Sequence, residues 1–143
     1  MIAIASDHAG FYMKNRINDF LSSKGIRTMD FGTYSEESCD YPVFAKKACA
    51  SVNSGECEMA ILVCGTGIGM SMVANKIKGI RAAVCSDEFS TEFTRRHNDA
   101  NVMCLGARVM SVEKALKLVG IFIDNKFDGG KHAIRVAMLE NED

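Results

Sequence analysis

The order of apolar and amphipathic segments constrains the fold of this chain more than any other feature. Five short apolar runs recur along the 143 residues, and a segment with helical spacing follows each of them. The runs cover residues 2–6, 26–31, 59–64, 80–85 and 102–105, and the helical segments cover 11–24, 42–54, 70–76, 87–96 and 112–125, with a last helix over 131–140. Alternation of this kind builds a parallel sheet with helices on both faces. We therefore predict an α/β fold, a three-layer α/β/α sandwich around a five-stranded parallel sheet.

Length and charge balance limit what the chain can bind. A chain of 143 residues is expected to form a single domain over residues 1–143, with a core that needs no disulfide or metal to support it. Seventeen basic and eighteen acidic side chains give a formal net charge of −1, so we expect neither nucleic acid nor an anionic membrane as a partner. The apolar run at 59–64 is also far too short to cross a bilayer.

Six cysteines raise the possibility of disulfides or a zinc site, and their spacing argues against both. They are widely separated and form no C-x-x-C pair, which most zinc sites contain. The N-terminal run ends at Asp7-His8 with no basic stretch before it, unlike a secretory signal. We expect a reduced, cytoplasmic protein with no metal, in which every cysteine except Cys64 is a core thiol: Cys39, Cys49, Cys57, Cys85 and Cys104.

Polar residues follow several predicted strands, at the positions where a parallel sheet binds its ligands. Asp7-His8 follow the first strand, Cys64 and a glycine-rich loop end the third, and Ser86-Asp87 follow the fourth. These groups should share one edge of the sheet, because the carboxyl ends of parallel strands lie together. His97-Asn98 instead precede the fifth strand, and they reach that edge only if the preceding helix stops short or bends back.

The loop that follows the third strand, Gly65-Thr66-Gly67-Ile68-Gly69, is the strongest local signal. Its glycines leave main-chain N–H groups open to a ligand, and the helix beyond adds partial positive charge, which suits an anion. A tight turn without a ligand explains a lone G-x-G-x-G equally well, and the spacing differs from the dinucleotide-binding G-x-G-x-x-G. Cys64 lies beside these amides, where its thiolate would serve as a nucleophile or a base, with Thr66 to orient it or relay a proton.

All three histidines lie at the ends of predicted elements: His8, His97 and His132. A single histidine in such a place is usually an ordinary surface residue. Here each of the three has a polar or charged neighbour, which makes coincidence a weaker explanation. Asp7-His8 in particular joins a carboxylate to a group that titrates near neutrality, a combination suited to acid–base work on a hydroxyl.

Three basic residues are candidates for binding an anion. Arg108 follows the fifth strand, and Lys131 and Arg135 lie four residues apart on one face of the last helix. A solvated helix face explains such cations in most proteins, although Gly129-Gly130 just before Lys131 leave space for an anion. Local cations in a chain of net charge −1 favour a small phosphate over a polynucleotide. Arg95 and Arg96 are expected to be surface charges only.

Taken together, these residues resemble one family closely, the type B ribose-5-phosphate isomerases and the related galactose-6-phosphate and allose-6-phosphate isomerases. The matching strings occur in family order over nearly the whole chain. They are Ala5-Ser6-Asp7-His8-Ala9-Gly10, Asp40-Tyr41-Pro42, Cys64-Gly65-Thr66-Gly67-Ile68-Gly69, Ala74-Asn75-Lys76, Gly79-Ile80-Arg81-Ala82, Arg96-His97-Asn98-Asp99-Ala100-Asn101, Gly106-Ala107-Arg108 and Gly129-Gly130.

The resemblance implies a Rossmann-like fold and an aldose–ketose isomerisation through an enediol(ate), with no cofactor and no metal. By the same resemblance, Cys64 would be the base that moves a proton between C1 and C2, assisted by Thr66. The amides of residues 65–69 would stabilise the enediolate, in keeping with the donor-rich loop. His97 would open the furanose ring, with Asp7 as its partner at the substrate hydroxyls.

The resemblance also implies how the substrate is held and how the chains assemble. The binding residues would be His8, Asn98, Arg108, Lys131 and Arg135, of which the basic ones chiefly hold the phosphate. Family members are homodimers or homotetramers whose sites lie between subunits, an arrangement that would also bring His97 to the catalytic edge. Where Lys131 stands the family commonly has Arg, and Lys lacks the bidentate fork that Arg offers to a phosphate.

Two other functions remain open from the sequence. Besides ribose 5-phosphate, the substrate of the pentose phosphate pathway, a six-carbon sugar phosphate such as allose 6-phosphate or galactose 6-phosphate would suit the same residues. A nucleotide-binding module could use the glycine loop for phosphates, but it would leave Cys64, His97 and Asp7-His8 without a role. Turnover of a sugar phosphate without nucleotide or metal separates these possibilities.

Overall fold

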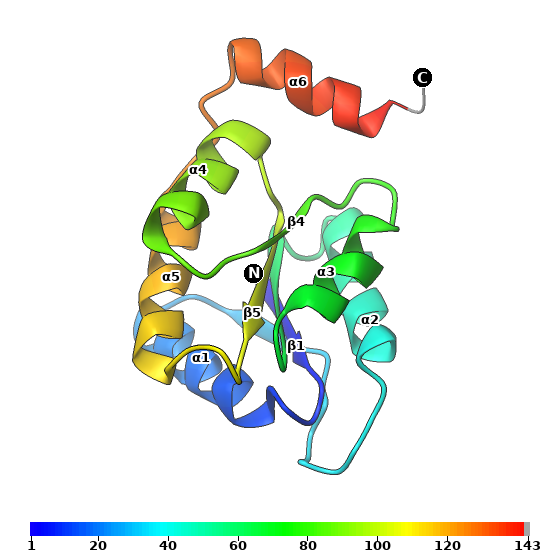
Figure 1. Cartoon of the computed structure of the whole chain (residues 1–143), viewed down its shortest axis with the longest axis vertical. Helices are drawn as coiled ribbons and strands as arrows, with labels where there is room; N and C mark the ends of the chain where they lie inside the picture. Colours follow the sequence, from blue (N-terminus) through cyan, green and yellow to red (C-terminus); the bar gives the residue numbers. More distant parts are fainter. Residues whose placement is uncertain (142–143) are drawn as a thin grey trace.

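Five parallel strands form one sheet, as the alternating pattern predicts (Figure 1). The computed structural model describes residues 1–141. Its strands are β1 (Ile2–Ser6), β2 (Thr28–Asp30), β3 (Met59–Cys64), β4 (Ala82–Val84) and β5 (Val102–Gly106). The order across the sheet is β2-β1-β3-β5-β4, so β3 lies at the centre and pairs with β1 on one side and β5 on the other.

The two edge strands are shorter than the sequence predicts. The run at 26–31 gives only Thr28–Asp30, and the run at 80–85 gives only Ala82–Val84. Each of these strands pairs with a single neighbour, and none of their residues is fully buried. An apolar run overstates the length of an edge strand because hydrogen bonds on one side alone hold it in the sheet.

Helices cover both faces of the sheet and confirm the predicted three-layer sandwich. On one face lie α1 (Phe11–Ser23), α4 (Glu88–Asn98) and α5 (Val112–Asp124), and on the other lie α2 (Tyr41–Asn53) and α3 (Ile68–Asn75) (Figure 1). Strand side chains alternate between the two cores, so Ile4 packs on the α1 and α5 side while Ala5 packs on the α2 and α3 side. Every predicted helix agrees with the structure to within two residues at each end. Within residues 1–141 no helix has both the length and the apolar character needed to cross a membrane.

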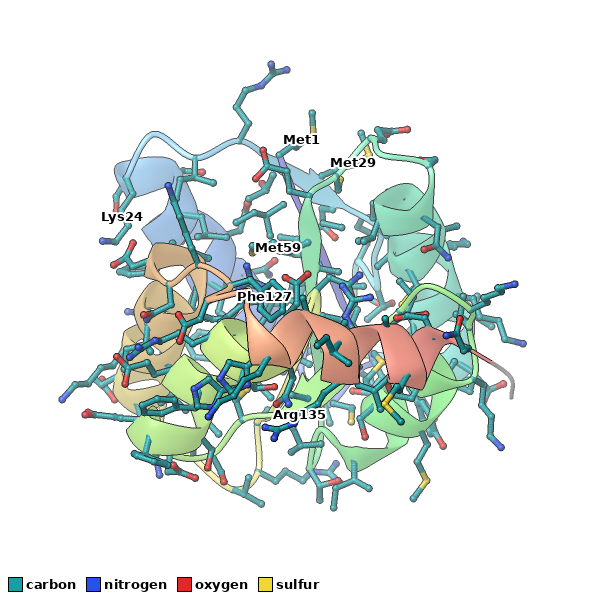
Figure 2. The ribbon with its side chains drawn as sticks, turned by 90° about the horizontal axis from the view of Figure 1, so that it is seen from above. Met1, Lys24, Met29, Met59, Phe127 and Arg135 are labelled. Carbon is teal, nitrogen blue, oxygen red and sulfur yellow. The ribbon has the colours of Figure 1, made fainter. Side chains whose placement is uncertain are left out.

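The last helix, α6 (Lys131–Glu140), stands apart from both layers. It lies across the end of the sheet where the strands begin, and among the other helices it packs chiefly against α4 (Figures 1 and 2). None of its residues is buried, and three large apolar side chains are about two-thirds exposed: Ile134, Met138 and Leu139. A helix with an apolar face normally packs that face against another element. The apolar face of α6 has no such cover within the described part of this chain.

Two expectations about single side chains are wrong. Cys39 is half-buried rather than a core thiol, because it lies in the loop after β2. Arg95 is not a free surface charge either: its guanidinium donates to the Ala100 carbonyl at 2.6 Å and to Asp99 at 3.1 Å, and it lies over the Phe122 ring. A long cationic side chain can cover apolar surface in this way, and charge alone does not reveal it.

A close backbone approach fixes the start of α1 against β3. Gly10 precedes the helix, and a Cβ at this position would lie 2.6 Å from the Val63 carbonyl oxygen and 2.7 Å from its Cγ1. Main-chain atoms of a central strand cannot move aside cheaply, so only glycine fits. The same contact holds the preceding residues, Asp7 and His8, next to the end of β3.

We expect Gly10→Ala to lower the free energy of unfolding by about 1–3 kcal/mol, the usual cost of overpacking. Gly120→Ala is the matched control, because a Cβ inside α5 would meet only Phe20 Cζ at an ordinary 3.8 Å. That change should instead stabilise the protein by about 0.5–1 kcal/mol, since alanine is the better helix former. Urea denaturation measures both, and equal effects of the two changes would contradict the close approach.

Candidate active site

The three central strands deliver three of the predicted site residues to one edge of the sheet. Asp7 follows β1, Cys64 ends β3 and Arg108 lies just beyond β5. Main-chain bonds extend the pairing past the strands: the N–H of Asp7 donates to the Val63 carbonyl at 3.2 Å, and the N–H of Ala107 donates to the Cys64 carbonyl at 2.9 Å. The structure therefore brings these residues together, as the position of the strand ends predicts.

The Cys64 thiol is nearly enclosed and faces the glycine loop. The side chain is 5% exposed, and its Sγ accepts the main-chain N–H of Gly67 at 3.1 Å. Gly67 makes this turn possible because its φ of 82° is left-handed and because a Cβ there would lie 3.0 Å from the Leu105 main chain. An amide directed at the sulfur stabilises negative charge on it, which is what a thiolate base requires.

Thr66 and Ile68 complete the turn into α3. The Thr66 hydroxyl accepts the N–H of Ile68 at 3.2 Å, so it supports the loop from within. The hydroxyl is also exposed enough to meet a ligand. The helix begins at Ile68, two residues earlier than predicted, which places the positive end of its dipole at the loop itself. Loop amides and a helix start therefore lie together, an arrangement that suits an anion.

Arg108 and Tyr41 border the same loop. Arg108 donates its main-chain N–H to the Gly65 carbonyl at 2.9 Å, and a Cβ at Gly65 would lie 3.5 Å from its Cδ. The Tyr41 ring packs so closely on Gly69 that a Cβ there would lie 2.7 Å from its Cζ. Tyr41 was not predicted as a site residue. Only its place in the Asp40-Tyr41-Pro42 string pointed to it, since nothing in its local pattern reveals a contact with α3.

Asp7 and His8 are each held in a defined orientation. The Asp7 side chain is 7% exposed, and its Oδ1 accepts the N–H of Gly10 at 3.1 Å. His8 accepts the main-chain N–H of Cys39 at Nδ1, with a donor–acceptor distance of 3.2 Å. The loop after β2 therefore reaches back to the end of β1 and fixes the imidazole.

Asp87, which follows β4, has a structural role. Its Oδ1 accepts the N–H of Ser90 at 2.7 Å and thereby caps the start of α4. This hydrogen bond holds the pKa of the Asp87 carboxyl below its ordinary value. A polar residue that follows a strand thus serves here to begin the next helix.

The remaining predicted residues lie at the opposite edge of the sheet. α4 runs without a bend to Asn98, and so His97 and Asn98 lie where the strands begin. A groove of about 320 Å³ lies between the end of α4 and α6. Its lining consists of His97, Asn98, His132, Arg135, Val136 and Leu139. Arg135 is labelled on α6 in Figure 2, and Lys131 begins the same helix.

His97 lies in a network of charged and aromatic groups. Its ring stacks on that of His132 with centroids 4.0 Å apart, and its Nε2 lies 3.8 Å from Asp128 Oδ2. Asp128 is also paired with Arg96 at 3.2 Å. Partial burial, followed by the nearby charges of His97, Lys131 and Arg135, lowers the pKa of His132 from its ordinary value. The sequence analysis assigned His132 no role. In the structure its ring packs against that of His97, a predicted site residue.

His97, Asp128 and His132 have the residue types of a metal site but not its geometry. The two imidazole rings lie nearly parallel, at 10°, so their nitrogen lone pairs do not converge on one point. Arg96 is paired with the Asp128 carboxylate, and the charges of Lys131 and Arg135 lie close enough to lower the pKa of His132. These surroundings favour an anion over a cation.

The two groups of residues are separated by the height of the sheet. A strand of five residues, such as β1 or β5, spans about 17 Å. Cys64, Asp7 and Arg108 lie at one end of that span, and His97 and Asn98 lie at the other. One chain therefore holds the predicted site residues in two groups, at opposite edges of its sheet.

Comparison with known proteins shows which family the chain belongs to. The sequence model of the Ribose/Galactose Isomerase family matches residues 2–139. The chain belongs to this family. It is 43% identical to ribose-5-phosphate isomerase B of Escherichia coli, over 96% of this chain and 93% of that protein. It is 42% identical to the D-erythrulose-4-phosphate isomerase of Pectobacterium atrosepticum, over 96% of this chain and 91% of that one. The solved structure of ribose-5-phosphate isomerase B from Clostridium thermocellum matches with a TM-score of 0.96 and 47% identity, covering 97% of this chain and 94% of that chain.

The buried cysteines differ from Cys39 in their expected reactivity. Burial raises the pKa of the Cys49 and Cys85 thiols to about 11, and it raises the pKa of Cys104 well above its ordinary value. Only about one part in a thousand of a thiol with a pKa near 11 is ionised at pH 8, and the thiolate is the reactive form.

We therefore expect iodoacetamide at pH 8 to leave Cys49, Cys85 and Cys104 unmodified in the folded protein while it labels the half-exposed Cys39. Mass spectrometry of the peptides measures this. The urea-unfolded chain is the control, in which all six cysteines should react. Rapid labelling of Cys85 in the folded protein would show that the core is open to solvent.

Proposed function

We propose that this chain, as a single isomerase domain over residues 1–143, interconverts ribose 5-phosphate and ribulose 5-phosphate. The observation that carries the proposal is the enclosed Cys64 thiol facing the Gly67 amide, at an edge that also holds Asp7 and Arg108. Family membership and the ribose-5-phosphate isomerases among the relatives support it. The proposed setting is the pentose phosphate pathway in the cytoplasm.

Isomerisation in this proposal is a proton transfer between two carbons. The Cys64 thiolate removes the proton from C2 of the open-chain aldose, and the electron pair moves to the aldehyde oxygen to form an enediolate. The N–H groups of residues 65–69 stabilise that oxygen, where preorganised donors have the largest effect. Cys64 then returns its proton to C1, and Thr66 relays the hydroxyl proton from the C2 oxygen to the C1 oxygen, which yields the ketose without cofactor or metal.

Ring opening precedes this step because the sugar is mostly cyclic in solution. In the proposal, the bond between C1 and the ring oxygen breaks, His97 protonates the ring oxygen, and Asp7 accepts the proton of the C1 hydroxyl. His8, Asn98, Arg108, Lys131 and Arg135 hold the substrate, and the cations among them hold the phosphate. Asp128 Oδ2 lies 3.8 Å from His97 Nε2 and is placed to orient that imidazole.

A complete site in this proposal needs two chains. Cys64 and His97 lie at opposite edges of one sheet, and α6 exposes an apolar face beside His97. A homodimer in which α6 of one chain lies over the catalytic edge of the other would bury that face. It would also join His97 of one subunit to Cys64 of the other. We propose such a homodimer, or a homotetramer built from two of them.

The first test is turnover of ribose 5-phosphate by the purified protein with no added metal or nucleotide. Cys64→Ala should reduce kcat by about 10²–10⁴-fold, the usual contribution of a general base, while the protein still binds the substrate. Cys57→Ala, which alters a core thiol that is 1% exposed, is the matched control and should keep kcat within about twofold. Full activity of Cys64→Ala would refute the mechanism.

Because the relatives include an isomerase of a four-carbon sugar phosphate, the assay should compare four-, five- and six-carbon substrates. Faster turnover of allose 6-phosphate or galactose 6-phosphate would favour the six-carbon alternative.

The second test distinguishes a shared site from one within a single chain. Cys64→Ala and His97→Asn should each be nearly inactive on the cyclic substrate. After the two variants are dissociated and reassociated together in equal amounts, half of the dimers should be mixed, with one intact site of two. Activity should then recover to about 25% of the unaltered enzyme, as two-fold symmetry requires. No recovery, although mass spectrometry detects mixed dimers, would place both residues in the same chain's site.

A further inference from the structure

The loop between β2 and α2 passes the end of β1 and contacts it at two points. Near its start, the N–H of Ser6 donates to the Gly32 carbonyl at 2.7 Å, and the N–H of Thr33 donates to the Ser6 carbonyl at 2.8 Å. Near its end, the N–H of Cys39 donates to His8 Nδ1 at 3.2 Å. Residues 32–39, which we call the clamp loop, are therefore bonded to Ser6 just before Asp7 and to His8 just after it.

A buried ammonium anchors the start of the clamp loop. The Lys14 side chain is 1% exposed, and its Nζ lies 2.8 Å from each carboxylate oxygen of Asp30 and 2.6 Å from the Thr33 carbonyl. The ring centroids of Phe11 and Tyr34 lie 5.5 and 5.2 Å from Lys14 Nζ, respectively. A buried ammonium is stable only while its partners stay in place. Lys14 therefore restrains the positions of the Asp30 carboxylate and the Thr33 carbonyl.

Asp30 in turn binds the backbone of the loop. Its Oδ1, besides accepting from Lys14, accepts the N–H of Gly32 at 2.8 Å. The Tyr34 hydroxyl donates to the main-chain carbonyl of Asp30 at 2.9 Å. The Asp30 carboxylate and the Asp30 carbonyl both bind the first residues of the clamp loop, so the loop leaves β2 in a defined direction.

The contact at the other end of the loop determines which nitrogen of His8 carries a proton. A main-chain N–H is always a donor, so His8 Nδ1 must accept and carries no proton in this arrangement. In the neutral imidazole the proton is then on Nε2, which becomes the donor that His8 offers. The hydrogen bond on one ring nitrogen sets the tautomer of the whole ring.

We propose that the clamp loop positions His8 as an Nε2–H donor to the substrate phosphate, with Lys14 and the Cys39 amide as its positioning residues. The inference rests on the proposed function, which supplies a phosphate for His8 to bind. It assigns roles to two groups that the isomerisation itself does not use. The Cys39 main chain acts here rather than its thiol, which lies 3.9 Å from His8 Nδ1.

Two replacements of His8 test the tautomer directly. Glutamine places its amide nitrogen near the position of Nε2, and asparagine places its own near Nδ1. Calorimetry with inorganic phosphate should show that His8→Gln binds it roughly three- to tenfold more tightly than His8→Asn, which is the worth of one hydrogen bond. The KM for ribose 5-phosphate should follow the same order, with kcat within about twofold between the two variants. Equal affinities, or tighter binding by His8→Asn, would overturn the proposal.

Removal of the two anchors tests the positioning. Cys39→Pro deletes the N–H and should raise the phosphate dissociation constant and the KM roughly three- to tenfold, with kcat little changed. Cys39→Ala, which keeps the N–H and removes the thiol, is the matched control and should bind phosphate as the unaltered chain does. Lys14→Met should raise the KM in the same way. A lowered melting temperature with an unchanged KM would mean that Lys14 only stabilises the fold.

The phosphate titration keeps this inference separate from the proposed function. If the unaltered protein binds phosphate but isomerises no sugar phosphate, the proposed function fails while the order of the His8 variants still tests the clamp loop. Circular dichroism shows which variants are folded. If Cys39→Pro or Lys14→Met does not fold, the two His8 variants decide the matter, because His8 is only half-buried.

Discussion

The parallel pairing of β1, β3 and β5 is the constraint on which the rest of the molecule depends. Two main-chain bonds carry this pairing one residue past the strands, from Asp7 to Val63 and from Ala107 to Cys64. They place the backbones of Asp7 and Cys64 side by side before any side-chain interaction is considered. The close approach of Gly10 to Val63 and of Gly67 to Leu105 then brings the start of α1 and the glycine turn before α3 to the same edge. The register of β3 sets the position of Cys64, since a slip of one residue in that strand would turn Cys64 to the other face of the sheet.

The same constraint explains what could be predicted from the sequence. Fully buried strands read as uninterrupted apolar runs, so β1 and β3 have the predicted bounds and β5 differs by one residue. The position of Asp7 and Cys64 follows from strand direction alone. The lengths of the edge strands and the surroundings of Arg95, Cys39 and Tyr41 were not predicted correctly. Cys39 and Tyr41 make contacts with segments distant in sequence, and Arg95 lies over the distant Phe122 ring. No local pattern records that Tyr41 packs on Gly69 or that Cys39 contacts His8.

Strand direction also explains why the predicted site residues of one chain lie at two opposite edges of the sheet. A helix that returns antiparallel to its strand must end at the opposite edge, so His97 in the last turn of α4 lies far from Cys64. Asp99 fixes that end: its left-handed φ of 48° stops the helix, and its carboxylate accepts from Arg95 and Arg81. Because the end of α4 is fixed, His97 has a defined position although it is not at the catalytic edge. This is the arrangement expected if each chain supplies half of a site to a partner.

α6 shows how polar contacts can hold a helix that has no core of its own. Just before its start, Asp128 pairs with Arg96 at 3.2 Å, and at its end Glu140 pairs with Arg81 at 2.6 Å. Exposed pairs contribute little to stability, usually less than about 1 kcal/mol each, so they orient the helix more than they stabilise it. The apolar residues between these two anchors, including Ile134 and Met138, remain exposed. These two ion pairs set the direction of the helix. In the proposed homodimer, burial against the other chain would stabilise it, and the same contact would bring its cations, Lys131 and Arg135, to the proposed phosphate site.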